Sequence, residues 1–450
     1  MFKVAGIFVF FVIFVTLDLR AENLKDIWQK AHTLTPLEKP MLSPQDLKQA
    51  RFGRKLFFDA RMSFGGEISC ASCHNPTNFF ADGLPTSKGL SIGERNAPTV
   101  VNSFALERAF WDGRSDHIAA QALGPLENIA EHGTNRLQVV RHVESFYLKE
   151  YQSIFGDFPD IETNRSQAKP SFAQVSLTEN LKRRFEDSSF FSFLKGTFSL
   201  AARRHAKPPK DAISWQQGYE ALKPADKSRI NQVFANIGIA ISQYERTLTA
   251  TRSPFDAFMA NWTDPGEVPL SQNFDQGAFE GLKIFLGKGQ CTNCHSGPNF
   301  TDNEFHNIGV ISEFGDPGRV VGLRLAEDEG AFHCESEYYR AYPWLSNTDA
   351  CEEKPYLDPD NPDNVGAFKT PSLRNVALTR PYFHNGSASS LHAVMQHYNE
   401  LPDEPLPTGH LSQSLARVAL NEEEIANVIK FMKSLSAPLE QPLDLDYQAN

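Results

Sequence analysis

Two copies of one five-residue pattern, Cys-x-x-Cys-His, carry the clearest chemistry in this sequence. The residues that define these two pentads are Cys70, Cys73 and His74 in the first copy and Cys291, Cys294 and His295 in the second. Cysteines three positions apart lie on one face of a helical turn, where both thiols can form thioethers to the vinyl groups of one haem. The adjacent histidine is then placed to bind the iron as its proximal ligand.

Chance does not explain the two pentads. A shuffled chain with 6 Cys and 13 His in 450 residues would contain on the order of 0.002 of them. A zinc knuckle or a thioredoxin-like redox pair is the alternative use of this cysteine spacing. Zinc sites usually bring a second Cys/His pair nearby, and none follows either pentad. We therefore expect two covalently bound haem c groups.

The first 21 residues have the pattern of a secretory signal peptide. Lys3 supplies the positive charge, residues 4–17 form the apolar stretch, and Ala21 ends a plausible cleavage site. The alternative is an uncleaved membrane anchor, but the apolar run is shorter than the roughly 20 residues that span a bilayer. Because c-type haem is attached outside the bacterial cytoplasm, the pentads agree with export. We expect a periplasmic protein.

The charge balance excludes one class of partner. The net charge is −11, and no basic stripe runs along the chain, so the sequence argues against nucleic acid binding. An acidic chain is compatible with a basic electron-transfer partner, although the charge alone does not identify one.

The chain repeats one plan twice. Residues 53–57 (GRKLF) and 281–285 (GLKIF) each predict a short amphipathic helix that leads into a pentad. A stretch rich in Gly, Pro and Asn follows each pentad as a loop, and each half closes with an apolar helical pattern, at 233–248 and 425–435. Helix, pentad, loop and helix form the plan of a c-type cytochrome. We expect a mainly α fold with two tandem c-type cytochrome-like haem domains.

Domain boundaries follow from this plan and from a Pro- and Gly-containing stretch between the halves. We expect a signal peptide at 1–21, an N-terminal haem domain at 22–252, a linker at 253–274, a C-terminal haem domain at 275–440 and a tail at 441–450.

Two irregular segments interrupt the halves. Residues 165–215 are expected to be a surface elaboration, and residues 311–365 a long loop excursion. The second segment contains Cys334 and Cys351, the two cysteines outside the pentads. In an oxidising compartment these two thiols are expected to pair, and the alternative is that both stay free.

Five further blocks of sequence accompany the pentads in a fixed order. They are residues 110–114 (FWDGR), 121–128 (QALGPLEN), 131–133 (EHG), 368–375 (FKTPSLRN) and 379–386 (TRPYFHNG). Together with the pentads they resemble the bacterial dihaem cytochrome c peroxidase family, including its MauG-like branch. The resemblance covers most of the mature chain and implies that hydrogen peroxide is reduced to water. The electrons would come from a small redox protein such as a c-type cytochrome or a cupredoxin.

The resemblance also assigns roles around the first haem. Peroxide cleavage needs a group that takes a proton from the oxygen at the iron and returns it to the leaving oxygen. The resemblance gives this role to Glu131 and places Gln121 and Pro125 in the same distal pocket. Without the resemblance, Glu131 would be interpreted as an ordinary solvated carboxylate. Trp111 falls where the family has a tryptophan between the haems, where it shortens electron hops or simply fills the core.

The sixth ligand is expected to differ between the two haems. Residues 75–110 contain neither His nor Met. Family members with a blocked first haem take a His from that loop, so we expect the first haem to be five-coordinate or water-bound. At the second haem the resemblance implies a Met or Tyr 14 residues after His384, which here is Tyr398. Met395 shares its helix face and remains an alternative, as does the neighbouring His397. A packed core aromatic is another role for Tyr398.

The resemblance further implies a calcium ion between the haems. The side-chain oxygen of Asn96 and the backbone carbonyls of Thr379 and Pro381 would bind it, with waters completing the shell.

One departure from the family bears on the alternative function. The MauG-like alternative is an enzyme that oxidises side chains of a partner protein. The enzyme that matures methylamine dehydrogenase has a surface Trp just before its second pentad, and this chain has residues 287–290 (GKGQ) there. The alternative therefore lacks its expected exit route, although Tyr398 supports it. A non-enzymatic electron carrier is a third hypothesis, which an open distal pocket with Glu131 opposes.

Overall fold

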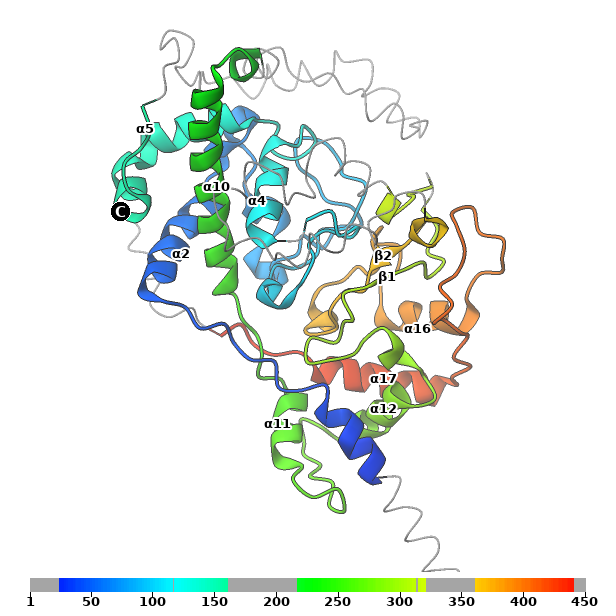
Figure 1. The fold of residues 1–450 in the computed structure, drawn as a ribbon. Helices are drawn as coiled ribbons and strands as arrows, with labels where there is room; N and C mark the ends of the chain where they lie inside the picture. Colours follow the sequence, from blue (N-terminus) through cyan, green and yellow to red (C-terminus); the bar gives the residue numbers. More distant parts are fainter. Residues whose placement is uncertain (1–23, 116, 161–216, 313–314, 321–360, 441–450) are drawn as a thin grey trace, which may run out of the picture.

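A computed structural model describes residues 24–115, 117–160, 217–312, 315–320 and 361–440. The signal peptide, most of both irregular segments, Cys334, Cys351 and the tail lie outside the described residues. The described chain is mainly helical with one short two-stranded sheet, which confirms the expected fold class (Figure 1). None of the helices in the described ranges has the length and apolar character of a bilayer-spanning segment.

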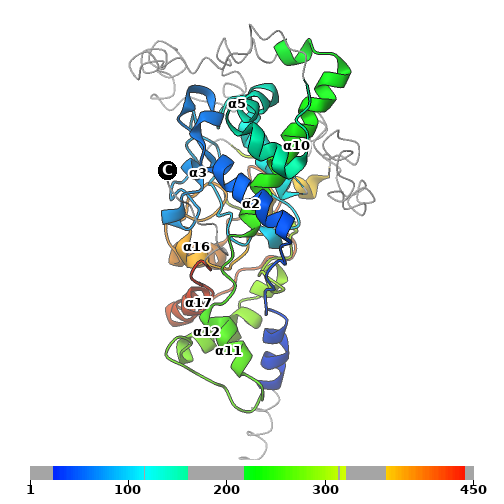
Figure 2. The same ribbon diagram turned by 90° about the vertical axis from the view of Figure 1, so that its left-hand side faces the viewer.

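The first half is built around one long buried helix. Its helices are α2 (Pro44–Phe57), α3 (Cys70–Cys73), α4 (Ile118–Glu127), α5 (Arg136–Phe155) and α10 (Pro224–Arg246). A capping box between Ser43 and Asp46 starts α2. Apolar side chains of α2, α4 and α5 pack against α10 in one cluster that includes Phe57, Leu126 and Phe234. Figures 1 and 2 show α10 running through the middle of this half.

The second half repeats the arrangement with an aromatic core. It contains α11 (Pro254–Asn261), α12 (Gln276–Leu286), α16 (Leu391–Glu400) and α17 (Glu422–Ser434). Strand β1 (Phe305–His306) pairs antiparallel with β2 (Phe368–Lys369). Phe255, Phe285, Phe300 and Phe431 contact one another with ring centroids 5.1–6.2 Å apart, within the range of favourable aromatic pairs.

In each half, the helix that leads into the pentad crosses the closing helix at a glycine. A Cβ on Gly53 of α2 would overlap the carbonyl oxygen of Ala240 in α10, and a Cβ on Gly281 of α12 would overlap that of Asn427 in α17. Both glycines occupy the first position of the repeated sequence blocks at 53–57 and 281–285. The repeated plan of helix, pentad, loop and helix is therefore present in both halves, and close backbone packing explains why each copy begins with Gly.

The ends of the described chain pack on the opposite halves. Ile27 and Ala31, on a helix over residues 24–32, belong to the aromatic core of the second half, and Trp28 Nε1 donates a hydrogen bond to the Trp262 carbonyl at 2.8 Å. At the other end, the Glu440 N–H donates to the Thr249 carbonyl at 2.8 Å. These contacts link the halves, and the boundaries at 22–252 and 275–440 remain a prediction.

Candidate active site

The first pentad forms a single helical turn, α3, that follows a loop. The backbone N–H of Ser69 donates to Ser72 Oγ at 3.0 Å at the start of this turn. His74 follows directly, and its Nδ1 donates to the Phe80 carbonyl at 3.2 Å. Burial lowers the pKa of His74, so the imidazole is held neutral and its Nε2 keeps a lone pair. This is the state in which a histidine binds iron.

The second pentad repeats that arrangement on a 3-10 turn over Cys291–Asn293. His295 Nδ1 donates to the Phe300 carbonyl at 3.0 Å, and burial lowers the pKa of His295 as well. Histidines that bind metals almost always donate their other ring N–H to a carbonyl or carboxylate. Both sites meet this requirement with two cysteines beside the histidine, so the residues present fit two haem c groups.

A cavity of about 420 Å³, which includes space open to solvent, adjoins the first pentad. Its wall brings together predicted residues that are far apart in the sequence: Cys70, Cys73 and His74 with Gln121, Pro125 and Glu131. Gln121 and Pro125 lie on α4, and Glu131 lies on the loop that follows it. The predicted neighbourhood of the first haem is therefore present, while the chemical roles of these side chains remain predictions.

Glu131 is held in an environment that suits proton transfer. Burial raises the pKa of Glu131, although the charge of Arg114 and a hydrogen bond from Asn128 Nδ2 at 2.8 Å oppose the rise. The Leu90 N–H donates to the Glu131 carbonyl at 3.1 Å and fixes the backbone. A carboxyl group with a raised pKa exchanges protons more readily near neutral pH than an ordinary glutamate does.

Two titratable residues that line the same cavity were not among the predicted site residues, Glu245 of α10 and His132. Glu245 Oε2 is buried without a hydrogen-bond partner, and burial raises the pKa of Glu245 to about 8. The sequence could have identified Glu245, because it lies between Ile241 and Leu248 at helical spacing. A carboxylate on the apolar face of a predicted helix is expected to be buried. For His132 the signal was its position next to Glu131.

The three candidates for the sixth ligand of the second haem have different surroundings. Burial and the nearby Cys294 and Cys291 thiols raise the pKa of Tyr398, so this phenol lies beside the second pentad. Met395 is 5% exposed and packs in an apolar cluster between α16 and α17. His397 Nε2 donates to the Ile308 carbonyl at 2.8 Å. Tyr398 also packs against the cluster that contains Met395, and its ligation of the iron remains a prediction.

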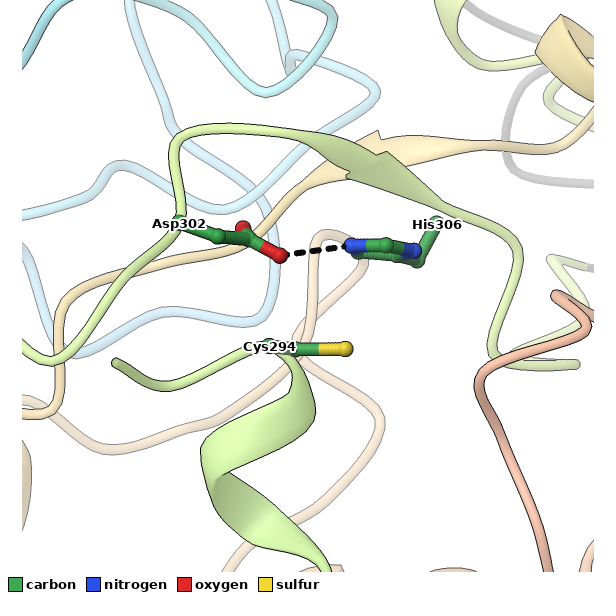
Figure 3. A group of neighbouring side chains, drawn as sticks. All are labelled: Cys294, Asp302 and His306. Carbon is green, nitrogen blue, oxygen red and sulfur yellow. Dashed lines mark hydrogen bonds and ion pairs between the residues drawn. The ribbon is translucent and has the colours of Figure 1, made fainter. Parts of the chain in front are cut away.

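An ion pair also lies beside the second pentad (Figure 3). His306 Nε2 is 2.9 Å from Asp302 Oδ2, and the two side chains lie next to Cys294. Burial opposes protonation, but the bond to Asp302 and the Cys294 thiol raise the pKa of His306 to about 10. Ligand atoms of these three residues lie within 4.8 Å of one another, a spacing compatible with a metal ion. Because the pentad commits Cys294 to a thioether, we assign this cluster to the edge of the haem site.

Trp111 lies where the two halves meet. Its Nε1 donates to the Asn96 carbonyl at 2.9 Å, and its own carbonyl accepts from the Lys369 N–H at 2.8 Å. Its ring is 6.5 Å from that of His384. Trp111 therefore contacts both halves, as a residue between two haems must.

Asn96 belongs to the same junction. Its backbone N–H donates to the His384 carbonyl at 2.7 Å, and its Nδ2 donates to the Leu84 carbonyl at 2.8 Å. Its Oδ1 is therefore the side-chain atom that would bind a cation. The calcium site with Thr379 and Pro381 remains a prediction.

Comparisons with known proteins agree with this geometry. Residues 47–199 match the family model of di-haem cytochrome c peroxidase. The chain is 29% identical to the cytochrome-c peroxidase IdrP2 of Denitromonas iodatirespirans, over 88% of this chain and 84% of that protein. It is 26% identical to the methylamine utilization protein MauG of Methylophilus methylotrophus, again over 88% and 84%.

A solved structure shows the same fold at lower identity. The diheme peroxidase BthA of Burkholderia thailandensis superposes with a TM-score of 0.54 at 17% identity, covering 88% of this chain and 87% of that one. The family model includes the first pentad, and the similarity to the relatives extends over most of the chain. With a repeated haem-binding arrangement in each half, the chain is similar to di-haem cytochrome c peroxidases over most of its length.

Proposed function

We propose that the protein is a dihaem peroxidase that reduces hydrogen peroxide to water with electrons from a small redox protein. The observation that carries this proposal is the cavity in which Glu131 and Gln121 adjoin the first pentad. When bound, the first haem supplies the iron at which peroxide is cleaved, and the second haem passes on or shares electrons.

The side chains of the cavity handle the protons of this reaction. Glu131 takes the proton from the peroxide oxygen nearest the iron and returns it to the far oxygen, which leaves as water. The Gln121 amide offers both a donor and an acceptor to orient the peroxide. Trp111 links the halves and provides an aromatic stepping stone for electrons.

The test is Glu131→Gln, followed by stopped-flow reaction of the haem-loaded protein with peroxide. We expect the second-order rate constant to fall by about 100-fold or more, the usual scale for a positioned acid–base group. Glu107→Gln removes an exposed carboxylate of the same half and should keep the parent rate. An E131Q variant that reacts as fast as the parent would remove Glu131 from the mechanism.

The second candidate function is oxidation of side chains on a partner protein, as in the MauG-like branch. Tyr398 beside the second pentad favours it, because an oxygen ligand stabilises the more oxidised states of iron. Residues 287–290 oppose it, because they offer no tryptophan as an exit route. Incubation with peroxide and candidate partners, followed by mass spectrometry of the partner, distinguishes the two functions.

Three further proposals rest on the sequence. The donor is a small c-type cytochrome or a cupredoxin, and the protein is exported to the periplasm after cleavage at Ala21. A calcium ion binds at Asn96 between the halves. N-terminal sequencing of the mature protein tests the second proposal, and metal analysis before and after chelation tests the third.

A further inference from the structure

Asn128 organises the short loop that carries Glu131. Its carbonyl accepts the N–H groups of Glu131 at 3.0 Å and of Gly133 at 2.8 Å. Its side-chain Oδ1 accepts the Ala130 N–H at 2.9 Å, which forms an Asx turn. Three backbone N–H groups of residues 130–133 therefore bond to one asparagine, and the path of the loop depends on it.

The same side chain also holds the Glu131 carboxyl group. Because Oδ1 is bonded within the turn, the Nδ2 end of the amide faces Glu131 and donates to its Oε1 at 2.8 Å. The second carboxyl oxygen, Oε2, accepts no hydrogen bond from the described residues, and Glu131 lines the cavity at the first pentad. The chain thus engages one oxygen and leaves the other available to a molecule in the cavity.

The backbone of Glu131 is fixed from the other side by the loop at residues 89–90. The Leu90 N–H donates to the Glu131 carbonyl at 3.1 Å. A Cβ on Gly89 would lie 2.6 Å from the Glu131 Cα, so the two backbones are in close contact. Rotation of the Glu131 side chain is the freedom that remains, and the bond to Asn128 restricts it.

Other charged groups surround Glu131. Burial raises the pKa of Glu131, and the charge of Arg114 and the Asn128 hydrogen bond oppose that rise. Arg114 is held in turn by Asp112, with Nη1 3.0 Å from both carboxylate oxygens. Of the two opposing influences, the hydrogen bond is the one that a substitution at Asn128 changes. The remaining titratable groups of the cavity wall are Cys70, Cys73, His74, His132 and Glu245.

We propose that Asn128 is a positioning residue, whose amide holds Oε1 of Glu131 and leaves Oε2 to transfer the proton of peroxide. This deepens the peroxidase function proposed above and rests on it. Oε2 takes the proton from the near oxygen and returns it to the far oxygen, which leaves as water with the electron pair of the O–O bond. The small redox protein of the proposed function replaces those electrons, and Asn128 gains and loses no proton or electron.

Fluoride tests this role apart from turnover, because it binds a ferric haem that has an open position. A protonated Glu131 donates a hydrogen bond to fluoride, so the fluoride affinity falls as the pH rises through the pKa of Glu131. The pH at which the affinity begins to fall, the fluoride midpoint, therefore reports the protonation of Glu131 at equilibrium. Spectrophotometric titration of the haem-loaded protein between about pH 4 and pH 9 measures it.

Two substitutions remove the amide and keep the turn. Asn128→Asp retains an acceptor for the Ala130 N–H but turns a carboxylate oxygen toward Glu131. We expect the fluoride midpoint to rise by about one pH unit, because a like charge replaces a donor. Asn128→Ser keeps the turn through its hydroxyl and is too short to reach Oε1, so about half that shift is expected.

The matched control is Asn361→Asp in the other half of the molecule. Asn361 Oδ1 also accepts the N–H of the residue two positions on, Asp363, at 3.0 Å. This substitution adds the same charge to the same kind of turn and should leave the fluoride midpoint unchanged. Glu131→Gln, alone and combined with Asn128→Asp, should remove the midpoint, because the titrating group is gone.

Each outcome decides the proposal. A higher midpoint in N128D and N128S, absent in N361D and in the E131Q background, supports it. An unchanged midpoint in both Asn128 variants overturns it, as does a shift that persists in E131Q. Weaker fluoride binding at every pH without a shift also overturns it, because Asn128 would then only hold the loop together.

The proposal and the peroxidase function can fail separately. If the midpoint shifts as expected but the parent does not react with peroxide, the positioning role stands and the peroxidase function fails. If E131Q slows the reaction with peroxide but the Asn128 variants keep the parent midpoint, the peroxidase function stands and the positioning role fails.

Discussion

The two haem sites share the side that holds the haem and differ on the side that would face a substrate. In both, a neutral histidine follows two cysteines and donates Nδ1–H to the carbonyl of a phenylalanine. The cavity at the first pentad is lined by Glu131, His132 and Glu245. At the second pentad the neighbours are Tyr398 and the Asp302–His306 pair. The repeated plan binds haem, and the segments outside the repeat decide what each haem does.

This division has a structural origin. The shared side consists of a pentad and the loop within six residues of it, so it is made by contiguous sequence. The differing side comes from α4 and the loop after it in the first half and from α16 in the second. Changes in those segments can give one site acid–base chemistry without disturbing how the haem is held.

The largest effect is expected at the glycines that the two halves share. Gly53→Ala and Gly281→Ala each force a methyl group against a backbone carbonyl, so each should lower the free energy of unfolding by about 3 kcal/mol. Urea unfolding followed by circular dichroism measures this, and the Soret spectrum reports which haem environment changes. Gly218→Ala is the matched control, because its methyl group would meet only the Leu137 side chain at 3.9 Å. Equal stability of all three variants would contradict the crossing geometry.

The second-largest effect is expected on the reduction potential of the second haem. The resting protein should show one high-spin and one low-spin ferric haem by EPR. Tyr398→Met should raise the potential of the low-spin haem by on the order of 100 mV, because a thioether favours the reduced iron. The peroxide reaction should stay near the parent rate, since O–O cleavage occurs at the other site. If Y398M keeps the parent potential and spectrum, Tyr398 is not a ligand, and Met395 is the next candidate.

The smallest effect is a pH dependence from Glu245. Burial raises its pKa to about 8 in the folded protein, whereas the unfolded chain loses this proton near its ordinary value. Between those values the folded state binds more protons, so stability falls as the pH rises. Glu245→Gln cannot ionise and should therefore gain stability over the parent between pH 5 and pH 8, by about 1 kcal/mol after local relaxation. Parallel pH profiles of parent and E245Q in thermal unfolding would show that Glu245 ionises normally.

The sequence by itself determined the features that depend on residues close together in the chain. The pentads fix the haem attachment, because thioether chemistry depends on a spacing of three residues. The repeated blocks at 53–57 and 281–285 predicted the helices that lead into them, and helical periodicity predicted α10 and α17. The residues of the first cavity came from the family resemblance, since Gln121 and Glu131 alone have no pattern that separates them from surface residues.

Tertiary structure decided which side chains meet across long separations. Met395 and Tyr398 share a helix face in the sequence, and only the packing of α16 on α17 showed that both meet one apolar cluster and that Tyr398 also lies near Cys294. Packing also brought Glu245 and His132 into the first cavity and placed residues 24–32 on the second half. Periodicity reports that a residue faces a core, but which core, and with what neighbours, depends on contacts that no local pattern contains.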